Sequence, residues 1–221
     1  MMNQRRQFIK TGMGLLATGM GLVLTPFLPS IRWAWGQTQR TIVPKGTDLK
    51  TLVNKHPENL DTRHLDVTPV EDFGIMGLSD YEQDVDRWRL SVQGGAKTAI
   101  QFSYKEIRAF PSIEKEVLLI CPGFFANHGR WKGVSMPALL REAGVKKDIT
   151  HVWFSGPEGR YEKVEQFPIK DVLSNKVFLA YSVNGKNLPV RNGFPLRIVA
   201  QDYYGYTWVK YVSEMKLIKA D

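Results

Sequence analysis

The strongest structural signal in this chain lies in the run Asn192-Gly193-Phe194-Pro195-Leu196-Arg197-Ile198-Val199. Its second half continues to Ala200 as an apolar run of strand length, and we expect a buried strand there. Arg197 lies between two aliphatic residues of this run, where a solvated surface charge is unusual. A charge on an exposed strand face is the alternative, which the apolar neighbours on both sides disfavour.

A second apolar run leads to a cysteine. Val117-Leu118-Leu119-Ile120 predicts a buried strand that delivers Cys121 at its end, where Pro122-Gly123 turns the chain. Cys121 is the only cysteine of the 221 residues, so it cannot form an internal disulfide. Because a free thiol is open to oxidation, we expect it to be buried as a small apolar side chain or committed to a ligand.

Short strands and small helices make up the rest of the chain. Ser103 and Glu106 form a capping box in front of a short helix, which Pro111 ends. The other expected elements are strands over 87–92, 151–154, 177–183 and 208–218 and a helix over 136–143. This order predicts a strand-rich α+β domain over residues 65–221, after an irregular leader over residues 37–64.

The first 36 residues have the features of an export signal. Arg5 and Arg6 lie in Gln4-Arg5-Arg6-Gln7-Phe8-Ile9-Lys10, an apolar stretch follows over 11–28, and Ala34-Trp35-Gly36 offers a cleavage site. We therefore expect a twin-arginine signal over residues 1–36, read by the twin-arginine translocase, and a periplasmic protein that is exported already folded. An uncleaved membrane anchor is the alternative, which the four glycines and the proline of the stretch disfavour.

The charge of the chain does not indicate nucleic-acid binding. The formal net charge is +8, but the first 36 residues carry four basic residues and no acidic one. The remainder of the chain is therefore only mildly basic, and we expect no nucleic-acid partner. The sequence also has no zinc-ligand spacing and no glycine-rich phosphate loop in front of a helix.

These motifs, taken in order, resemble a known family. With Tyr204-Gly205-Tyr206 and Lys210-Tyr211-Val212 further on, the Cys121 and Arg197 stretches closely resemble the molybdopterin-binding domain of the sulfite oxidase family. The resemblance runs from about Val67 to Ile218. The chain is most similar to the short, twin-arginine-exported bacterial branch that includes the periplasmic methionine sulfoxide reductase catalytic subunit. It ends soon after Ile218, so we expect it to lack the immunoglobulin-like dimerisation domain of the sulfite oxidases proper.

The resemblance implies a molybdenum-molybdopterin (Mo-MPT) cofactor. In the family a single cysteine thiolate binds molybdenum beside the two sulfurs of the pterin dithiolene, and Cys121 is the matching position. A soft thiolate suits a metal held by sulfur. Arg197 and Lys210 match the basic residues that hold the phosphate of the pterin. Asn192 stands where many members of the family carry histidine.

Further residues are implied near the cofactor and the substrate. In the methionine sulfoxide reductase branch, the segment that ends at Phe73 approaches the cofactor, and Glu71 and Asp72 stand here where that enzyme has asparagines. His128 and Arg130 follow Cys121 within nine residues, in a loop that we expect to face the metal. We predict that His128 moves protons and that Arg130 attracts an oxyanion. Plain surface residues are the alternative for both.

The resemblance implies a molybdenum oxidoreductase that moves an oxygen atom to or from a small substrate. Reduction of S- or N-oxides is favoured over a sulfite dehydrogenase or oxidase activity, because the acidic pair disfavours an anionic substrate. The sequence carries no haem-attachment motif and no cysteine cluster, so we expect a separate electron-transfer partner, a cytochrome or a membrane haem subunit. The other classes are a non-catalytic binding or assembly protein without metal and a plain thiol protein.

Overall fold

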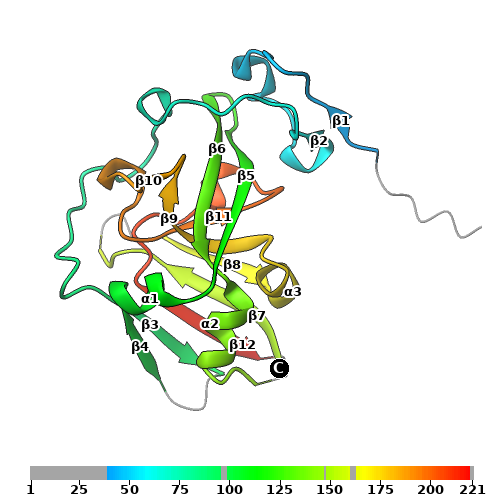
Figure 1. Ribbon diagram of the computed structural model, residues 1–221. Helices are drawn as coiled ribbons and strands as arrows, with labels where there is room; N and C mark the ends of the chain where they lie inside the picture. Colours follow the sequence, from blue (N-terminus) through cyan, green and yellow to red (C-terminus); the bar gives the residue numbers. More distant parts are fainter. Residues whose placement is uncertain (1–38, 96–98, 147, 160–162, 220–221) are drawn as a thin grey trace, which may run out of the picture. The chain divides into compact units, whose positions relative to one another are not determined.

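The computed structural model describes residues 39–95, 99–146, 148–159 and 163–219 (Figure 1). The predicted twin-arginine signal over residues 1–36 lies outside this part of the chain and stays a prediction. Within the described ranges, no helix is both long enough and apolar enough to cross a lipid bilayer.

Two five-stranded sheets organise the chain. The first has the order β10-β9-β6-β5, with β11 also paired to β9, and the second has the order β4-β3-β12-β7-β8. β12 is parallel to β3 and antiparallel to β7, so the end of the chain closes the second sheet between two earlier strands. The strands are β1 Thr41–Ile42, β2 Leu60–Asp61, β3 Arg89–Gly94, β4 Ile100–Ser103, β5 Ser112–Cys121, β6 Phe125–Val134, β7 Ile149–Ser155, β8 Val164–Pro168, β9 Val177–Val183, β10 Lys186–Asn187, β11 Arg197–Ala200 and β12 Glu214–Lys219. The α-helices are α1 Tyr104–Ala109, α2 Met136–Glu142 and α3 Ile169–Leu173.

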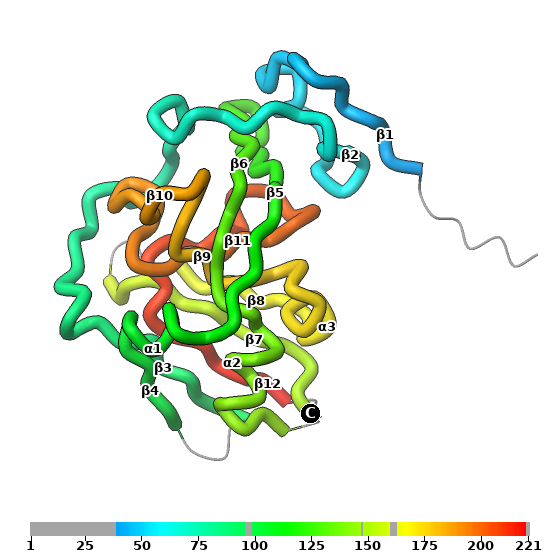
Figure 2. The backbone as a smooth tube through the Cα atoms, in the orientation of Figure 1, coloured from blue at the N-terminus to red at the C-terminus, as the bar shows by residue number. Residues whose placement is uncertain are grey.

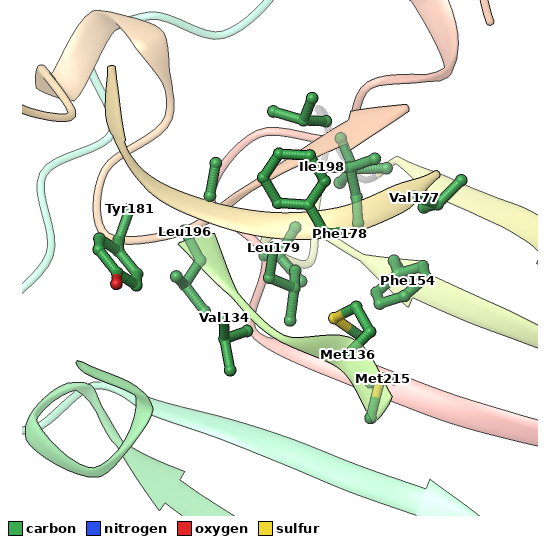
Figure 3. Packing of buried hydrophobic residues seen from close by; sticks show 14 of the residues in the cluster. Val134, Met136, Phe154, Val177, Phe178, Leu179, Tyr181, Leu196, Ile198 and Met215 are labelled. Carbon is green, nitrogen blue, oxygen red and sulfur yellow. The ribbon is translucent and has the colours of Figure 1, made fainter. Parts of the chain in front are cut away.

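The two sheets share one hydrophobic core. β9 is buried at all of its positions, as its continuous apolar sequence Val177-Phe178-Leu179-Ala180-Tyr181 predicts. Figure 3 shows Phe178 and Leu179 of β9 beside Phe154 of β7 and Met215 of β12, all in the same buried cluster. The side chains of β9 that pack against β7 and β12 therefore hold the first sheet against the second.

The segment before residue 65 packs on the outer face of β5 and β6. Val43, Leu52 and Leu60 form a second buried cluster with Leu118 and Ile120 of β5. From residue 39 on, this segment holds the short parallel strands β1 and β2 and the 3-10 turns Leu49–Leu52 and Pro57–Asn59, and the rest of it is irregular. Because side chains alternate along a strand, Leu119 and Cys121 face the opposite way.

The predicted α+β class is confirmed, and two local predictions are wrong. The residues after Cys121 are not a loop: they turn tightly at Pro122–Phe124 and return as β6, antiparallel to β5 (Figure 2). The last strand begins at Glu214 rather than at Trp208. Tyr211 has a φ of 57°, in the left-handed region that strands do not use, so the chain cannot enter the strand before it.

Candidate active site

A cavity of about 310 Å³ lies at the end of β5 that carries Cys121. Five segments far apart in the sequence line it: the chain after Asp72, the β5–β6 hairpin, the connection from β7 to β8 with Gly156, Pro157 and Lys163, residues 191–197, and residues 205–211. The cavity brings together five of the residues that the sequence analysis predicted, and each of them lines it: Phe73, Cys121, Asn192, Arg197 and Lys210.

The thiol of Cys121 forms one end of the site. Cys121 is the last residue of β5 and is only 6% exposed, and its Sγ lies 3.4 Å from Sδ of Met76. Burial raises the pKa of the thiol. No three His, Cys, Asp or Glu side chains of the described residues gather into a metal-binding group. A metal at Cys121 would therefore take its other ligands from a cofactor or a substrate.

Two cations, Arg197 and Lys210, line another part of the cavity. Arg197 is the first residue of β11 and is buried; its Nη1 donates to the carbonyl oxygen of Asn192 at 3.0 Å, and its guanidinium lies over the rings of Trp131 and Trp208 at 5.0 and 5.4 Å. Desolvation lowers its pKa to about 9. None of the ion pairs among the described residues includes Arg197. A buried cation without a carboxylate partner favours binding of an anion at this end of the cavity.

Lys210 adds a second charge beside the first. Burial and the positive charge of Arg197 together lower the pKa of Lys210 to about 8. Its Nζ donates to the carbonyl oxygen of Arg191 at 3.2 Å, and, like Arg197, it has no carboxylate partner within the described ranges. A bound phosphate would remove the repulsion between the two cations, because its negative charge stabilises both.

The turn that leads to β11 shapes this end of the cavity. The buried Oδ1 of Asn192 has no hydrogen-bond partner among the described residues, so it is free to accept a hydrogen bond from a ligand. Gly193 has a φ of 105°, and a Cβ there would lie 2.9 Å from Cβ of Lys210. A glycine at 193 is therefore required for Asn192, Arg197 and Lys210 to meet.

Several lining residues escaped the sequence analysis, and Asn127 is the clearest. Its Nδ2 donates to the carbonyl oxygen of Gly74 at 3.2 Å, and its Oδ1 accepts from the Gly74 N–H at 3.1 Å. This pair fastens the chain after Phe73 to β6. Asn127 lies opposite Leu119 in the hairpin register. A hairpin that turns at Pro122-Gly123 would have predicted this, because alternate side chains then point to the same face as Cys121.

Arg191 supports the same wall from the other side. Its Nη2 donates to the carbonyl oxygens of Val70 and Glu71 at 3.0 and 3.2 Å. The carboxylates of Glu71 and Asp72 are exposed in the 3-10 turn Val70–Asp72, and neither residue lines the cavity. The segment thus reaches the site through Phe73 and the residues after it, and not through the acidic pair.

The structure does not bring His128 and Arg130 to the cavity. Both belong to strand β6, and their side chains alternate away from the face that carries Asn127. His128 is fully buried, its Nδ1 lies 3.3 Å from the carbonyl oxygen of Asp66, and burial lowers its pKa. The guanidinium of Arg130 pairs with the Glu116 carboxylate at 3.0 Å on an exposed strand face. The prediction failed because it assumed a loop where the chain forms a hairpin.

Replacement of Arg130 tests this placement. Because the Arg130–Glu116 pair is exposed and lies outside the cavity, we expect Arg130→Gln to change kcat/KM less than twofold and the free energy of unfolding by less than about 0.5 kcal/mol. Steady-state kinetics and urea unfolding of the variant measure both. A tenfold loss of kcat/KM with an unchanged fold would contradict the geometry and return Arg130 to the substrate side.

Residues 78–221 match the family described as oxidoreductase molybdopterin binding domain. The chain belongs to this family. It is therefore an oxidoreductase of the sulfite oxidase type, as the resemblance predicted, and the cofactor of the family is molybdenum-molybdopterin.

Curated relatives of this oxidoreductase family lie between 24% and 29% identity. An uncharacterised oxidoreductase of Bacillus subtilis, YuiH, is 29% identical over 66% of this chain and 74% of its own length. A putative protein-methionine-sulfoxide reductase subunit of Azospira oryzae, YedZ1, is 25% identical over 96% of this chain and 79% of its own. The protein-methionine-sulfoxide reductase catalytic subunit MsrP of Gluconobacter oxydans is 24% identical over 77% of this chain and 62% of its own.

A solved structure supports the fold. The sulfane dehydrogenase SoxCD from Paracoccus pantotrophus superposes with a TM-score of 0.59 and 23% sequence identity, over 63% of this chain and 40% of the other. At that identity the likeness concerns the arrangement of the strands and not the reaction.

The residues around the cavity fit the cofactor of the family. Cys121 offers a soft thiolate that would bind molybdenum. Arg197, Lys210 and the unpartnered amide oxygen of Asn192 would hold the phosphate. Bound there, the cofactor supplies two-electron redox chemistry coupled to oxygen-atom transfer. Arg197 and Lys210 would neutralise the phosphate of the bound cofactor, and Cys121 would hold its metal.

The unpaired cations predict an unusual pH dependence of stability in the cofactor-free protein. The pKa of Lys210 is about 8 in the folded chain against 10.5 in the unfolded chain, so between these values the unfolded chain binds more protons. Stability should therefore rise from pH 8 to pH 9, by roughly 0.5 kcal/mol once solvent screening is allowed for. Urea unfolding at the two pH values measures the rise. Lys210→Met should reduce it, because only the smaller contribution of Arg197, whose pKa is lowered to about 9, then remains. An equal rise in the variant would assign the effect to other groups.

Proposed function

We propose that this protein is a periplasmic molybdenum oxidoreductase that reduces sulfoxides, with methionine sulfoxide as the model substrate, using electrons from a separate redox protein. The observation that carries the proposal is the apolar rim on the Cys121 side of the cavity. Met76 and Tyr206 line the cavity and are nevertheless 45% and 56% exposed, and Phe124, in the turn directly after Cys121, is 70% exposed. Such a rim suits an uncharged sulfoxide with alkyl groups better than a hydrated oxyanion.

The placement of the cations supports the same choice. Arg197 and Lys210 are assigned to the phosphate of the cofactor, and Arg130, which was expected to attract an oxyanion, pairs with Glu116 away from the cavity. Two relatives are named as protein-methionine-sulfoxide reductase subunits, which agrees with this substrate class. Met76, whose thioether lies 3.4 Å from the Cys121 sulfur, indicates that a sulfur of the substrate type can be accommodated there.

Oxidation of sulfite is the second candidate, and Lys163 favours it. Lys163 lines the cavity, and its positive charge acts on Cys121, although its Nζ is also paired with Glu165 at 3.5 Å. A cation near the metal end would attract a sulfur oxyanion.

The experiment begins with protein purified from its native export pathway, in which molybdenum and released pterin are measured per chain. Reduction of methionine sulfoxide with a small-molecule electron donor and oxidation of sulfite with an electron acceptor are then compared. We expect about one molybdenum per chain and a kcat/KM for the sulfoxide at least about tenfold above that for sulfite. Faster sulfite turnover would select the second candidate. Matured protein without molybdenum and pterin would overturn the enzyme proposal in favour of a binding or thiol protein.

The export route has its own test. If residues 1–36 are a twin-arginine signal, changing Arg5 and Arg6 to lysine should keep the protein out of the periplasm, because the translocase reads the arginine pair. Fractionation of cells that express the two forms measures this. Equal amounts of both forms in the periplasm would contradict the twin-arginine route.

A further inference from the structure

Residues 73–81, named the strap here, cross the cavity between the 3-10 turn Val70–Asp72 and β3 without forming a helix or a strand. In Figure 2 this part of the chain runs past the tip of the β5–β6 hairpin and then down toward β3. The Met76 side chain of the strap touches Cys121, with the two sulfurs 3.4 Å apart. Cys121 is only 6% exposed, whereas Met76 is 45% exposed, so the methionine covers the thiol from the solvent side.

The backbone of the strap is tied down on both sides of Met76. On one side Gly74 exchanges two hydrogen bonds with the Asn127 side chain. Phe125 packs so closely on Gly74 that a Cβ there would clash with its ring. On the other side, the Tyr211 hydroxyl donates to the carbonyl oxygen of Leu78 at 3.5 Å, and the ring of Tyr211 packs edge-on against Tyr81. These ties fix where the strap lies over the cavity.

The side chain of Met76 itself is not held in the same way. Gly77, the next residue, has a φ of 71° and no atom within 4 Å of the position of a Cβ, so the turn beyond Met76 is open. Methionine has three rotatable side-chain bonds and adapts to the space around it. The side chain can therefore swing away from Cys121 while the backbone of the strap stays in place.

We propose that Met76 is the access- and specificity-determining residue of this cavity: its side chain covers the metal-binding thiol in the cofactor-free chain, swings aside to admit the metal, and then borders the space that the substrate enters. A sulfur already lies beside Cys121, so the space is suited to a thin, alkyl-substituted sulfur group. A bulky substrate must displace the Met76 side chain further than a small substrate does. The coverage of Cys121 depends on geometry alone, while the choice among sulfoxides rests on the proposed function.

The first test measures the coverage and needs no loaded cofactor. Cys121 is the only cysteine, so the alkylation rate of the cofactor-free full-length chain by iodoacetamide reports on this thiol alone. The rate rises with the accessibility of the thiol and with its thiolate fraction, and uncovering the thiol increases both. We expect Met76→Ala to raise this rate by about tenfold, because it removes the cover, and Met76→Leu, the matched control of similar volume, to stay within about twofold of wild type. Rates of the urea-unfolded chains, which should be equal, normalise the comparison. An unchanged rate in a folded Met76→Ala protein would overturn the proposal.

The second test measures specificity in the molybdenum-loaded enzyme. Met76→Ala should lower KM for both a bulky substrate, an oxidised unfolded polypeptide, and a small one, dimethyl sulfoxide. The factor by which KM falls should be at least about fivefold larger for the polypeptide, and kcat should change less than about twofold for either substrate. Equal changes in KM for both substrates would remove the specificity role. If neither sulfoxide is turned over while the alkylation result holds, the proposed function fails and the coverage by Met76 stands.

Discussion

Replacing Arg197 with methionine is expected to reduce molybdenum and pterin per chain to less than about a tenth of the wild-type content, because loss of a buried charge partner weakens binding by about 2–5 kcal/mol. Arg197 is buried at the cationic end of the cavity, and its neighbour Lys210 is the only other cation assigned to the phosphate. Metal analysis and pterin fluorescence of the purified variant measure the loss.

The same replacement should leave the cofactor-free fold intact. The buried guanidinium has no carboxylate partner within the described ranges, and desolvation lowers its pKa to about 9, so the empty cavity holds an uncompensated charge. Removal of this charge stabilises the folded chain and offsets the loss of the contacts that Arg197 makes with Trp131, Trp208 and the Asn192 carbonyl. We therefore expect the free energy of unfolding to stay within about 1 kcal/mol of wild type, or to rise.

Arg197→Lys is the matched control for this prediction. Lysine keeps a positive charge but lacks the planar fork of donors, so its cofactor content should lie between those of wild type and Arg197→Met. Full cofactor content in Arg197→Met would contradict the role of Arg197 at the phosphate. A cofactor-free Arg197→Met chain that does not fold would show instead that the guanidinium is needed for packing.

The ends of the site could be predicted from sequence because each stands out against a regular pattern. Arg197 is a charge inside an apolar strand, and Cys121 is the only thiol and follows directly on an apolar run. Both signals survive in the structure, where the two residues line one cavity. The sequence did not predict how close Arg197 and Cys121 lie to each other. They line the same cavity because β6 and β11 both pair with β9.

The substrate side was predicted wrongly for a physical reason. The run after Cys121 has polar residues and glycine, which is typical of a loop, yet it pairs with β5 from Phe125 onward. Alternate residues of a strand point to opposite faces, so Asn127 points into the cavity, and His128 and Arg130 point to the other face of the hairpin. Tertiary pairing overrode the local composition.

The strap beyond Phe73 could not be predicted from the sequence. Residues 73–81 show no hydrophobic period, and the contact that places them, from Gly74 to Asn127, spans 53 positions. Such a contact forms only when the hairpin and the chain before β3 have found each other, and nothing in the local sequence encodes it. The residue proposed to control access is therefore visible only in three dimensions.

Replacing Cys121 with serine should separate the metal end of the site from the phosphate end. The hydroxyl is a hard, weak ligand in place of a soft thiolate, so we expect turnover to fall by at least about a hundredfold. Arg197, Lys210 and Asn192 are unchanged, so at least half of the wild-type pterin should remain bound. Burying the hydroxyl at a site that is 6% exposed should lower the free energy of unfolding by about 1–3 kcal/mol.

Turnover, pterin content and urea unfolding of Cys121→Ser, measured beside those of Arg197→Met, decide between two interpretations of the cavity. If one cofactor molecule contacts both Cys121 and Arg197, the Cys121→Ser protein retains pterin but has no turnover, whereas the Arg197→Met protein has lost both pterin and turnover. If Cys121 is only a small buried side chain, Cys121→Ser turns over at the wild-type rate and shows nothing but the loss of stability. Wild-type turnover in the serine variant would therefore remove Cys121 from the metal site, whatever the family resemblance implies, because a thiolate ligand cannot be lost without changing the metal that it binds.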